Sequence, residues 1–594
     1  MRRCALPRRF SFQIVAALAL LCGPIISHAA DQPPTSSTVA RHGAEALNDN
    51  QFRELANQFI EADLRQYPEN ATEQGEHRYD HFLTDMSHEG IERRRHHAQT
   101  WKRKFQNVLA DHLSPANEAD REWLIAQTDD ELLSIEELRS FERSPGDYLP
   151  TEALNALFKR NFAPLDVRMK SATAREIAAL KNLAAARVNL EPQRTPKVTL
   201  EIVLQQMPGV TAFLQKDLPD AFAAAPQGPA KTAFLDANGK LVASVDSYTK
   251  WLKDNLLPRA TGNYAIGADA YKRMLADEEM VDIPLDELEE IGKDELTRLQ
   301  AEFQKTAHQI DPNRSPAEVA ASLNREHPTR EKLLPTITTG LAALREYVVS
   351  HHLATIPSDQ QPLVRETPPS MRATSFASMD APGPFEKSHE AYFYVTLPDP
   401  GWPQERQEQL LELFSPALIS DTSVHEVYPG HYVQFLNNRL NPDMVRALYS
   451  SGANFEGWAL YCEQMMLDEG LHNGNPKYRL AQLQMALMRA CRYLVGIRMH
   501  TKGMSVEDAE AFFQSNAYMT PHNAEVESCR GTEDPGYLRY QLGKLMILKL
   551  RGDVRKQQGD KFDLGKFHDA FLHQGAVPIP LIRRAMLGSD GPLL

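Results

Sequence analysis

Residues 424–431 read VHEVYPGH, and this short stretch decides what kind of protein the chain can be. Its two histidines and its glutamate are side chains of the types that bind zinc. In the usual zinc helix the histidines are four residues apart and share one face, and the glutamate between them acts as a base. His425 and His431 are six apart, which turns a regular helix by about 240° net and sends them to different faces. We therefore expect the helix to break at Pro429 and Gly430, because proline lacks the N–H and glycine tolerates unusual backbone angles.

The segment 455–463, FEGWALYCE, offers a third metal ligand. Zinc hydrolases commonly add a carboxylate from the next helix and leave one position open for water. The first helix can end near Leu440, so that the chain turns and returns antiparallel. Glu456 is flanked by apolar residues and is expected on an inward face, with Glu463 two turns further along it. The alternative for Glu456 is a glutamate that only caps a helix or forms a salt bridge.

The rest of the chain is typical of a helical protein. Apolar residues recur at helical spacing in the segments 44–64, 89–142, 172–225, 286–310 and 330–352. We expect Pro192 and Pro208 to break the helices of the third segment. No alternation of helices and strands is present, which argues against a doubly wound sheet.

Prolines cluster between residues 355 and 403, and the segment 389–397 among them is aromatic and β-branched. Such a segment bounded by turn formers predicts a strand, with an extended loop as the alternative. We therefore expect one short sheet within a large helical body. The expected organisation is a helical N-terminal part, 43–354, that forms one continuous body with a catalytic part, 355–594.

The first 29 residues have the three parts of a secretory signal. An arginine-rich start precedes an apolar run over residues 12–22 and small residues around Ala29 and Ala30. We expect cleavage after Ala29, or one residue later, and a disordered polar start at residues 30–42; an uncleaved anchor is the alternative. No later segment is long and apolar enough to cross a bilayer, so we expect a periplasmic or secreted protein with no stable membrane span.

Composition limits the partners of this chain of 594 residues, 42% of them hydrophobic and 24% charged. Its formal net charge is −14, and so acidic a surface repels phosphate backbones, so we expect no nucleic-acid binding. Cleavage would leave three cysteines, Cys462, Cys491 and Cys529, which we expect as buried thiols, although export would permit a disulfide. The sequence does not determine the oligomeric state.

The chain resembles the bacterial domain of unknown function 885 family in two motifs, HEVYPGH at 425–431 and FEGWALYCE at 455–463. Members of this family are similar to gluzincin zinc metallopeptidases. Further segments that resemble this family are YAIG at 264–267, PG at 535–536, FHD at 567–569 and GAVP at 575–578. The chain departs from the family at Tyr537, where members often carry glutamine. The resemblance implies a mainly α, two-lobed, zincin-like body with a small β-sheet next to the active-site cleft. It supplies no particular substrate.

A second resemblance concerns the segment 535–540, PGYLRY, which is similar to a segment of the angiotensin-converting enzyme family. That likeness implies that Tyr540 donates its O–H to the developing oxyanion and that Tyr537 and Arg539 lie nearby, against the substrate. Helix packing is the alternative role for the two tyrosines.

The motifs and resemblances lead to one functional hypothesis. One zinc ion, held by His425, His431 and Glu456, would activate a water, and Glu426 would take its proton while a short peptide is hydrolysed. The predicted strand, 390–397, would pair with the extended peptide. The alternatives are a zinc hydrolase of another amide, such as a cell-wall peptide, and a non-catalytic exported protein that binds metal or peptide.

Overall fold

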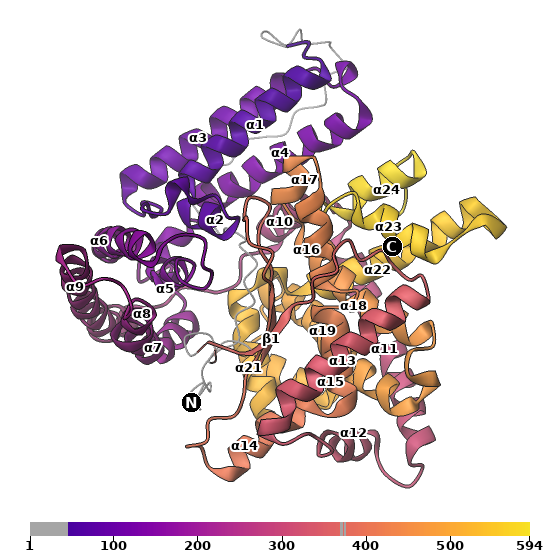
Figure 1. Ribbon diagram of the computed structural model, residues 1–594. Helices are drawn as coiled ribbons and strands as arrows, with labels where there is room; N and C mark the ends of the chain where they lie inside the picture. Colours follow the sequence, from indigo (N-terminus) through magenta and orange to yellow (C-terminus); the bar gives the residue numbers. More distant parts are fainter. Residues whose placement is uncertain (1–44, 369–371, 373–375) are drawn as a thin grey trace.

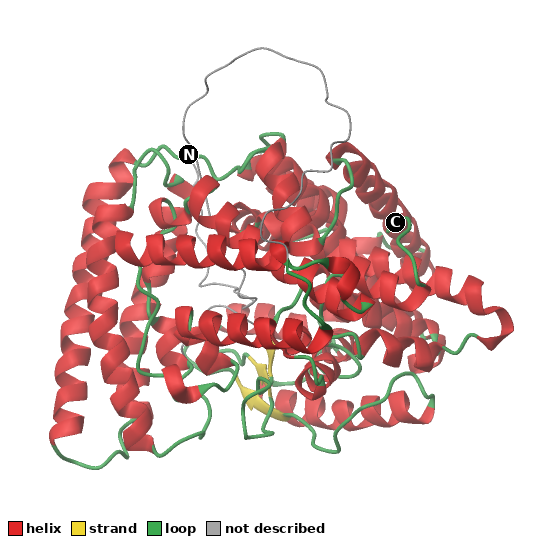
Figure 2. Ribbon diagram, turned by 90° about the horizontal axis from the view of Figure 1, so that it is seen from above, coloured by secondary structure: helices red, strands yellow, loops and turns green. Residues whose placement is uncertain are grey.

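The computed structural model describes residues 45–368, 372 and 376–594 (Figure 1). The signal peptide expected at residues 1–29 and the disordered start expected at residues 30–42 lie outside the described residues. The described chain is mainly helical and carries one small sheet (Figure 2), which confirms the expected fold class.

Helices α1–α9 form the N-terminal lobe, coloured indigo to purple on the left of Figure 1. They are α1 (Asp49–Gln66), α2 (Pro68–Glu73), α3 (His88–Asn107), α4 (Pro115–Leu132), α5 (Thr151–Asn155), α6 (Leu165–Asn189), α7 (Lys197–Ala212), α8 (Leu218–Ala221) and α9 (Pro229–Trp251). The remaining helices are α10 (Ala268–Glu279), α11 (Leu285–Ile310), α12 (Pro316–Asn324), α13 (Arg330–Ser350), α14 (Gln404–Leu411), α15 (Pro416–Glu426), α16 (His431–Leu440), α17 (Met444–Leu448), α18 (Gly452–Asp468), α19 (Pro476–Thr501), α20 (Val506–Ala517), α21 (Pro521–Glu533), α22 (Arg539–Gln558), α23 (Leu564–Leu572) and α24 (Ile579–Leu587).

Local sequence explains several helix boundaries. Helix α1 starts at a capping box, in which the Asn48 side chain accepts from the Gln51 N–H and the Gln51 side chain accepts from the Asn48 N–H. The helices expected at 286–310 and 330–352 are confirmed as α11 and α13. The break expected at Pro208 is wrong, because this proline lies inside α7. The buried side chains of Met207 and Val210 on either side of it hold the helix in the core despite the lost hydrogen bond.

The sheet has the order β1-β3-β2, built from β1 (Leu363–Glu366), β2 (Ala377–Asp380) and β3 (Tyr392–Val395). The predicted strand is confirmed as β3, which pairs in parallel with β1 and antiparallel with β2. The prediction that this strand pairs with a peptide is wrong, because both of its edges are already paired. The described strand that lies at the edge next to α15 is β2.

The described residues form two large hydrophobic cores and a small third one around Ala417, Leu418 and Ala481. The larger core extends from Phe52 on α1 to Ile582 on α24, so the first helices of the chain pack into the same core as the last. The second large core joins the helices between Met86 and Leu256. The division of the chain at residue 354 stays a prediction.

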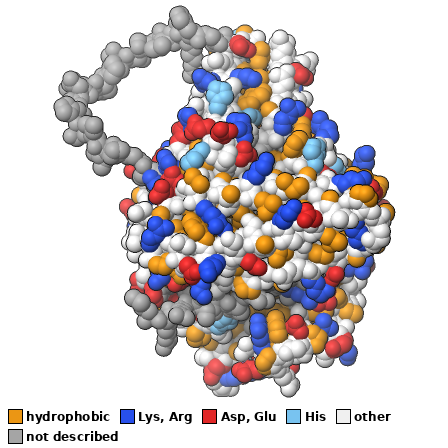
Figure 3. All heavy atoms as spheres, turned by 90° about the vertical axis from the view of Figure 1, so that its left-hand side faces the viewer, with side chains coloured by type: hydrophobic (Ala, Val, Ile, Leu, Met, Phe, Trp, Pro, Cys, Tyr) orange, Lys and Arg blue, Asp and Glu red, His pale blue; other side chains and the backbone are white. Residues whose placement is uncertain are grey.

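The cysteines and the surface add two observations. Cys462, Cys491 and Cys529 are buried thiols outside any disulfide of the described residues, which confirms the expected buried thiols. Acidic and basic side chains are interspersed over the outer face of the N-terminal lobe (Figure 3). Among the helices of the described residues, none combines the length and apolarity that crossing a bilayer requires.

Candidate metal centre

The chain breaks its helix between the two histidines. Helix α15 ends at Glu426, and α16 begins with His431. The four residues between them include a cis peptide bond at Tyr428-Pro429. Gly430 passes so close to the end of α15 that a Cβ atom there would lie 1.8 Å from the backbone oxygen of His425, so only glycine fits. The predicted break at Pro429 and Gly430 is confirmed.

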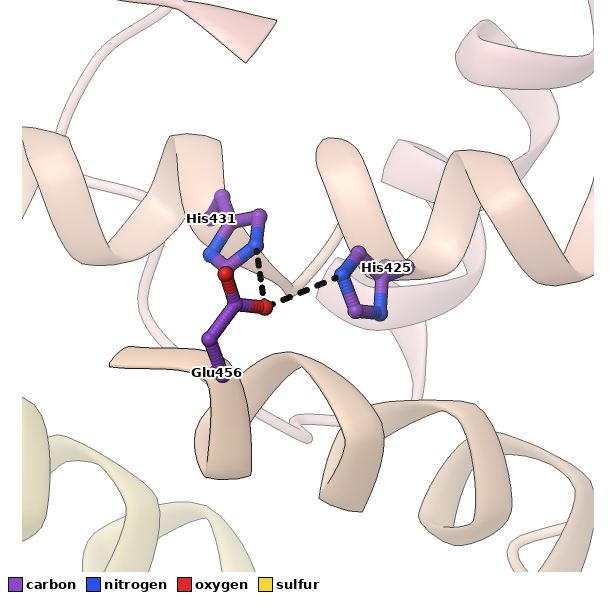
Figure 4. Close-up of side chains that lie close together, drawn as sticks. All are labelled: His425, His431 and Glu456. Atoms are coloured by element: carbon purple, nitrogen blue, oxygen red, sulfur yellow. Dashed lines mark ion pairs between the residues drawn. The ribbon is translucent and has the colours of Figure 1, made fainter. Parts of the chain in front are cut away.

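The break brings the two histidines to one point, opposite Glu456 on α18. The His425 Nε2 atom lies 3.7 Å from Glu456 Oε2, and His431 Nε2 lies 3.6 Å from the same oxygen (Figure 4). One ligand atom from each of the three residues lies within 4.8 Å of both others. The three side chains are at most 3% exposed. We call these three residues the triad.

The polar atoms of the triad fit a zinc ion. The Nε2 atoms of both histidines and both carboxylate oxygens of Glu456 are buried without a hydrogen-bond partner. Tetrahedral ligation with bonds of about 2.0–2.1 Å places ligand atoms about 3.3 Å apart, which is close to the 3.6 and 3.7 Å separations from Glu456 Oε2. The full set of ligand atoms, which lie within 4.8 Å of one another, would draw together on a bound ion. Two histidines and one carboxylate also form a ligand set of catalytic zinc, which leaves one position for water.

The carboxylate of Glu463 orients the His425 ring from the side opposite Glu456. The His425 Nδ1 atom lies 2.7 Å from Glu463 Oε1, so Nε2 is the atom directed toward Glu456. Metal-binding histidines usually donate their second N–H to such a carboxylate, which fixes the ring. The sequence places Glu463 on the same helix face as Glu456, but nothing in it identifies His425 as the partner of Glu463.

The pKa values of the three triad side chains are shifted in different directions. Burial alone would lower the pKa of His425, but the carboxylates of Glu456 and Glu463 raise it to about 10. Burial lowers the pKa of His431. Burial would raise the pKa of Glu456, but the two imidazoles hold it well below its usual range. A divalent cation would meet an ionised carboxylate and would displace a proton from His425.

Glu426, the predicted general base, is the last residue of α15 and is 3% exposed. Its Oε2 atom accepts a 3.0 Å hydrogen bond from the backbone N–H of Met379 on β2. Burial raises the pKa of Glu426 to about 7, although His425 and the Met379 N–H lower it. Such a pKa suits proton transfer near neutral pH. The role of Met379 has no signal in the sequence, because any residue can supply a backbone N–H.

Tyr540, the predicted oxyanion donor, lies in the first turn of α22. Burial raises its pKa to about 12, and the nearby Glu456 carboxylate contributes. Helices α18 and α22 approach closely at two glycines, since a Cβ on Gly457 would lie 2.5 Å from Gly543. Arg530 donates a 3.0 Å hydrogen bond to the Tyr540 oxygen. Tyr540 thus lies near the triad, and Arg530 is a neighbour to which the sequence assigns no clear role.

The two residues predicted to contact substrate have partners elsewhere. The Tyr537 hydroxyl donates to the backbone oxygen of Glu527, at 3.0 Å, and to its carboxylate. The Arg539 guanidinium forms ion pairs with Glu278 and Glu279 on α10. These buried contacts give both side chains a structural role, and their contact with substrate stays a prediction.

Solved structures with a similar fold come from bacteria. A candidate lipoprotein of unknown function from Shewanella oneidensis is 25% identical, with a TM-score of 0.77, over 90% of this chain and 99% of that chain. A candidate lipoprotein from Colwellia psychrerythraea is 19% identical, with a TM-score of 0.75, over 91% of this chain and 98% of that chain. These similarities support the overall fold.

A carboxypeptidase of the M32 class from Deinococcus radiodurans aligns with a TM-score of only 0.33 and 10% identity, over 80% of this chain and 89% of that chain, which supports no argument. None of the curated proteins compared with the chain matches it significantly. Residues 68–586 match the family described as "Bacterial protein of unknown function (DUF885)". The match covers most of the chain, which therefore belongs to this family.

Proposed function

We propose that this member of the DUF885 family is an exported zinc metallopeptidase that hydrolyses short peptides. The observation that carries the proposal is the convergence of four buried polar atoms without hydrogen-bond partners, from His425, His431 and Glu456. Each such atom costs of order 1–3 kcal/mol when it stays unsatisfied. A chain that keeps four of them at one point is best explained by a bound cation, and the ligand set favours zinc.

The reaction follows from the residues around this point. When bound, zinc supplies a Lewis acid that lowers the pKa of a water from about 15.7 to about 7. Glu426 is proposed to accept the proton of the attacking water and to pass it to the leaving amine. The Met379 N–H engages one carboxylate oxygen of Glu426, which leaves the other for the proton.

Tyr540 is proposed to donate its O–H to the oxygen that gains charge when the peptide carbonyl is attacked. The pKa of about 12 keeps this hydroxyl protonated and able to donate at neutral pH. Loss of one such donor typically costs about 3 kcal/mol of transition-state stabilisation. Arg530 holds the Tyr540 oxygen from the side and is proposed to orient it.

The peptide is proposed to extend along β2. Strand β3 has a neighbour on each side, whereas β2 lies at an edge of the described sheet and packs against α15. The Met379 N–H on this strand points at Glu426 instead of at β3, so the backbone of β2 borders the reacting groups. An extended substrate can add to such an edge by main-chain hydrogen bonds.

Export to the periplasm or beyond is proposed on two grounds. Residues 1–29 have the charge, apolar and small-residue pattern of a secretory signal. Two structural relatives are described as candidate lipoproteins, which are exported proteins. Intact-mass measurement of protein from the host envelope tests this part, and a mature chain that still carries Met1 would contradict it.

Metal analysis combined with peptide profiling tests the activity. The purified protein is analysed for bound metals and is incubated with a diverse peptide library, before and after chelation and zinc addition. We expect about one zinc per chain and cleavages that chelation removes and zinc restores. Protein without zinc affinity would overturn the proposal. Stoichiometric zinc without any cleavage would favour a binding protein, and cleavage of cell-wall peptides alone would favour the other amide hydrolase.

Glu426→Gln is the matched variant for the proposed base. The amide has nearly the shape of the carboxylate and still accepts a hydrogen bond, but it cannot take a proton. We expect turnover to fall by about 10²–10⁴-fold while zinc content stays unchanged. Unchanged turnover in the zinc-loaded variant would remove Glu426 from the mechanism.

A further inference from the structure

Glu426, the proposed general base, is held by a hydrogen bond from β2 and not from its own helix α15. A base must lie within hydrogen-bond reach of the proton that it takes, and a misplacement of 1 Å can cost about 10²-fold in rate. Glu426 is the last residue of α15, so the following residues do not continue the helix around it. The Met379 N–H is its hydrogen-bond donor, at 3.0 Å, and therefore the position of β2 matters to the base.

The residue after Met379 is tied to the N-terminal lobe. Asp380 Oδ1 accepts a 2.6 Å hydrogen bond from Arg160 Nη2 and lies 3.5 Å from Lys159 Nζ. Arg160 is 5% exposed and Asp380 15%, so the contact is shielded from water. Burial would raise the pKa of Asp380, but Lys159 and Arg160 lower it below its usual value, and the carboxylate is ionised.

The loop that carries Arg160 is itself clamped. It connects α5 to α6, and Arg168 on α6 donates to the backbone oxygens of Arg160, at 3.0 Å, and of Ala163, at 2.9 Å. Arg168 also donates to the Asn161 side chain, at 2.9 Å, and is 5% exposed. On the other side, Lys159 pairs with Glu73 on α2. A rigid anchor in the N-terminal lobe thus holds β2.

We propose that Arg160 and Asp380 are positioning residues, through which the N-terminal lobe holds the Met379 N–H against the general base Glu426. The inference rests on the proposed function, because Glu426 needs a fixed position only if it transfers a proton. The N-terminal lobe then contributes to the reaction without touching zinc or substrate. The series of contacts starts at Arg168, passes through the α5–α6 loop to Arg160 and Asp380, and ends with the hydrogen bond from Met379 to Glu426.

A simple tie between the lobes is the competing explanation, and the chain offers a matched control for it. Asp120 on α4 is also a buried carboxylate between two cations from other helices, with Arg53 at 2.9 Å and Arg446 at 2.8 Å. Arg446 lies on α17, so Asp120 also joins the N-terminal lobe to the rest of the chain, away from β2. Asp443 pairs with the same two arginines, so Asp120→Asn weakens a comparable tie between the lobes without disturbing Met379.

Turnover in a double-mutant cycle is the first readout. We expect Asp380→Asn and Arg160→Gln to lower kcat by about 10- to 100-fold, with Arg160→Lys in between because lysine keeps the charge but not the geometry. Asp120→Asn should keep the wild-type kcat. Added to Glu426→Gln, Asp380→Asn should cause little further loss, because the base that it positions is already absent.

Hydrogen exchange is the second readout, and it needs no turnover. Mass spectrometry of fragments that cover residues 376–381 follows the Met379 amide. We expect exchange at least about tenfold faster in Asp380→Asn and Arg160→Gln than in the wild type or Asp120→Asn, because the opened amide loses its acceptor.

The outcomes separate the two proposals. If Glu426→Gln keeps full turnover, the proposed function fails, whatever Asp380→Asn does. If Glu426→Gln loses turnover but Asp380→Asn keeps it, or loses it no more than Asp120→Asn does, the positioning inference fails alone. It also fails if the Met379 amide stays as protected in Asp380→Asn as in the wild type, or if the losses from Asp380→Asn and Glu426→Gln simply add.

Discussion

Two buried polar clusters of this protein differ in how far their polar atoms are hydrogen-bonded. In the first, Arg492 donates through Nε and Nη2 to both oxygens of Glu527, at 2.6 and 2.7 Å, and the Tyr537 hydroxyl donates to Glu527 as well. In the second, the triad, the facing nitrogens of His425 and His431 and both oxygens of Glu456 have no hydrogen-bond partner.

The difference separates a structural cluster from the proposed metal site. Both clusters are buried and carry charge, so burial and residue type do not separate them. The Glu527 cluster contains its own counter-charge and gains nothing from an added ion. In the triad the imidazole nitrogens lie 3.6 and 3.7 Å from Glu456 Oε2, too far for hydrogen bonds, and a cation between them would satisfy all of these atoms. The comparison predicts that mutations affect folding stability in the first cluster and metal binding in the second.

The largest expected effect is the loss of stability in Glu527→Ala. The variant leaves the Arg492 guanidinium buried without its counter-charge, which typically costs about 3–5 kcal/mol. The shift of the urea midpoint against the wild type measures it. Asp236→Ala breaks the exposed pair with Lys240 and should cost less than about 1 kcal/mol. If both variants unfold at the wild-type midpoint, the Glu527 cluster is not a stabilising one.

Acid should weaken the same cluster next. Burial would raise the pKa of Glu527, but Arg492 lowers it to about 2, from an ordinary value of 4.5. A lowered carboxylate pKa stabilises the fold above pH 4.5, and that contribution is lost as the pH falls toward 2. The stability difference between wild type and Glu527→Ala should therefore shrink from pH 5 to pH 3. A difference that grows over this range would contradict the assigned charge state.

A smaller effect is expected for Glu463, whose carboxylate orients the triad histidine His425. In Glu463→Gln the His425 ring loses a charged partner, and zinc affinity should fall by about 10- to 100-fold. Competition with a calibrated chelator measures the dissociation constant. Gln464→Glu, at the next and half-buried position, is the control and should bind zinc as the wild type does. Equal affinities in all three proteins would show that Glu463 does not support the metal.

The smallest change in stability is expected in Glu456→Gln with zinc removed. The substitution removes the carboxylate that faces the two imidazoles, but His425 keeps Glu463 as a charged partner, so the zinc-free variant should lose less stability than Glu527→Ala does. Added zinc should raise the melting temperature of the wild type but not of the variant. If zinc-free Glu456→Gln were destabilised as strongly as Glu527→Ala, the triad would be an ordinary structural cluster.

Much of the triad could be predicted because it depends on short-range chemistry. The six-residue spacing of His425 and His431 requires a break in any regular helix, and Pro429 and Gly430 supply one. The carboxylate that follows in FEGWALYCE needs only an antiparallel return. Long amphipathic helices such as α11 could also be predicted from the sequence, because their apolar periodicity extends over many turns.

The remaining features depend on contacts between distant segments. Strands β1 and β2 have four residues each and lack a strong β-pattern, so they are strands because β3 pairs with them. Arg539 resembles a substrate-binding residue in its short motif, but its partner Glu278 is 261 residues away. The link from Arg160 to Asp380 is of the same kind, since it spans 220 residues.

The reactivity of the three buried thiols can be used to measure local opening of the helices that carry them. Cys462 lies on α18 between Glu456 and Glu463, while Cys491 and Cys529 lie on α19 and α21. Burial raises the pKa of Cys462 far above its usual value, so it reacts with an alkylating reagent only when α18 opens. Because Cys462 lies on the same helix as the proposed ligand Glu456, the rate of Cys462 labelling would measure how often α18 opens, and a metal that joins Glu456 to the two histidines should slow it.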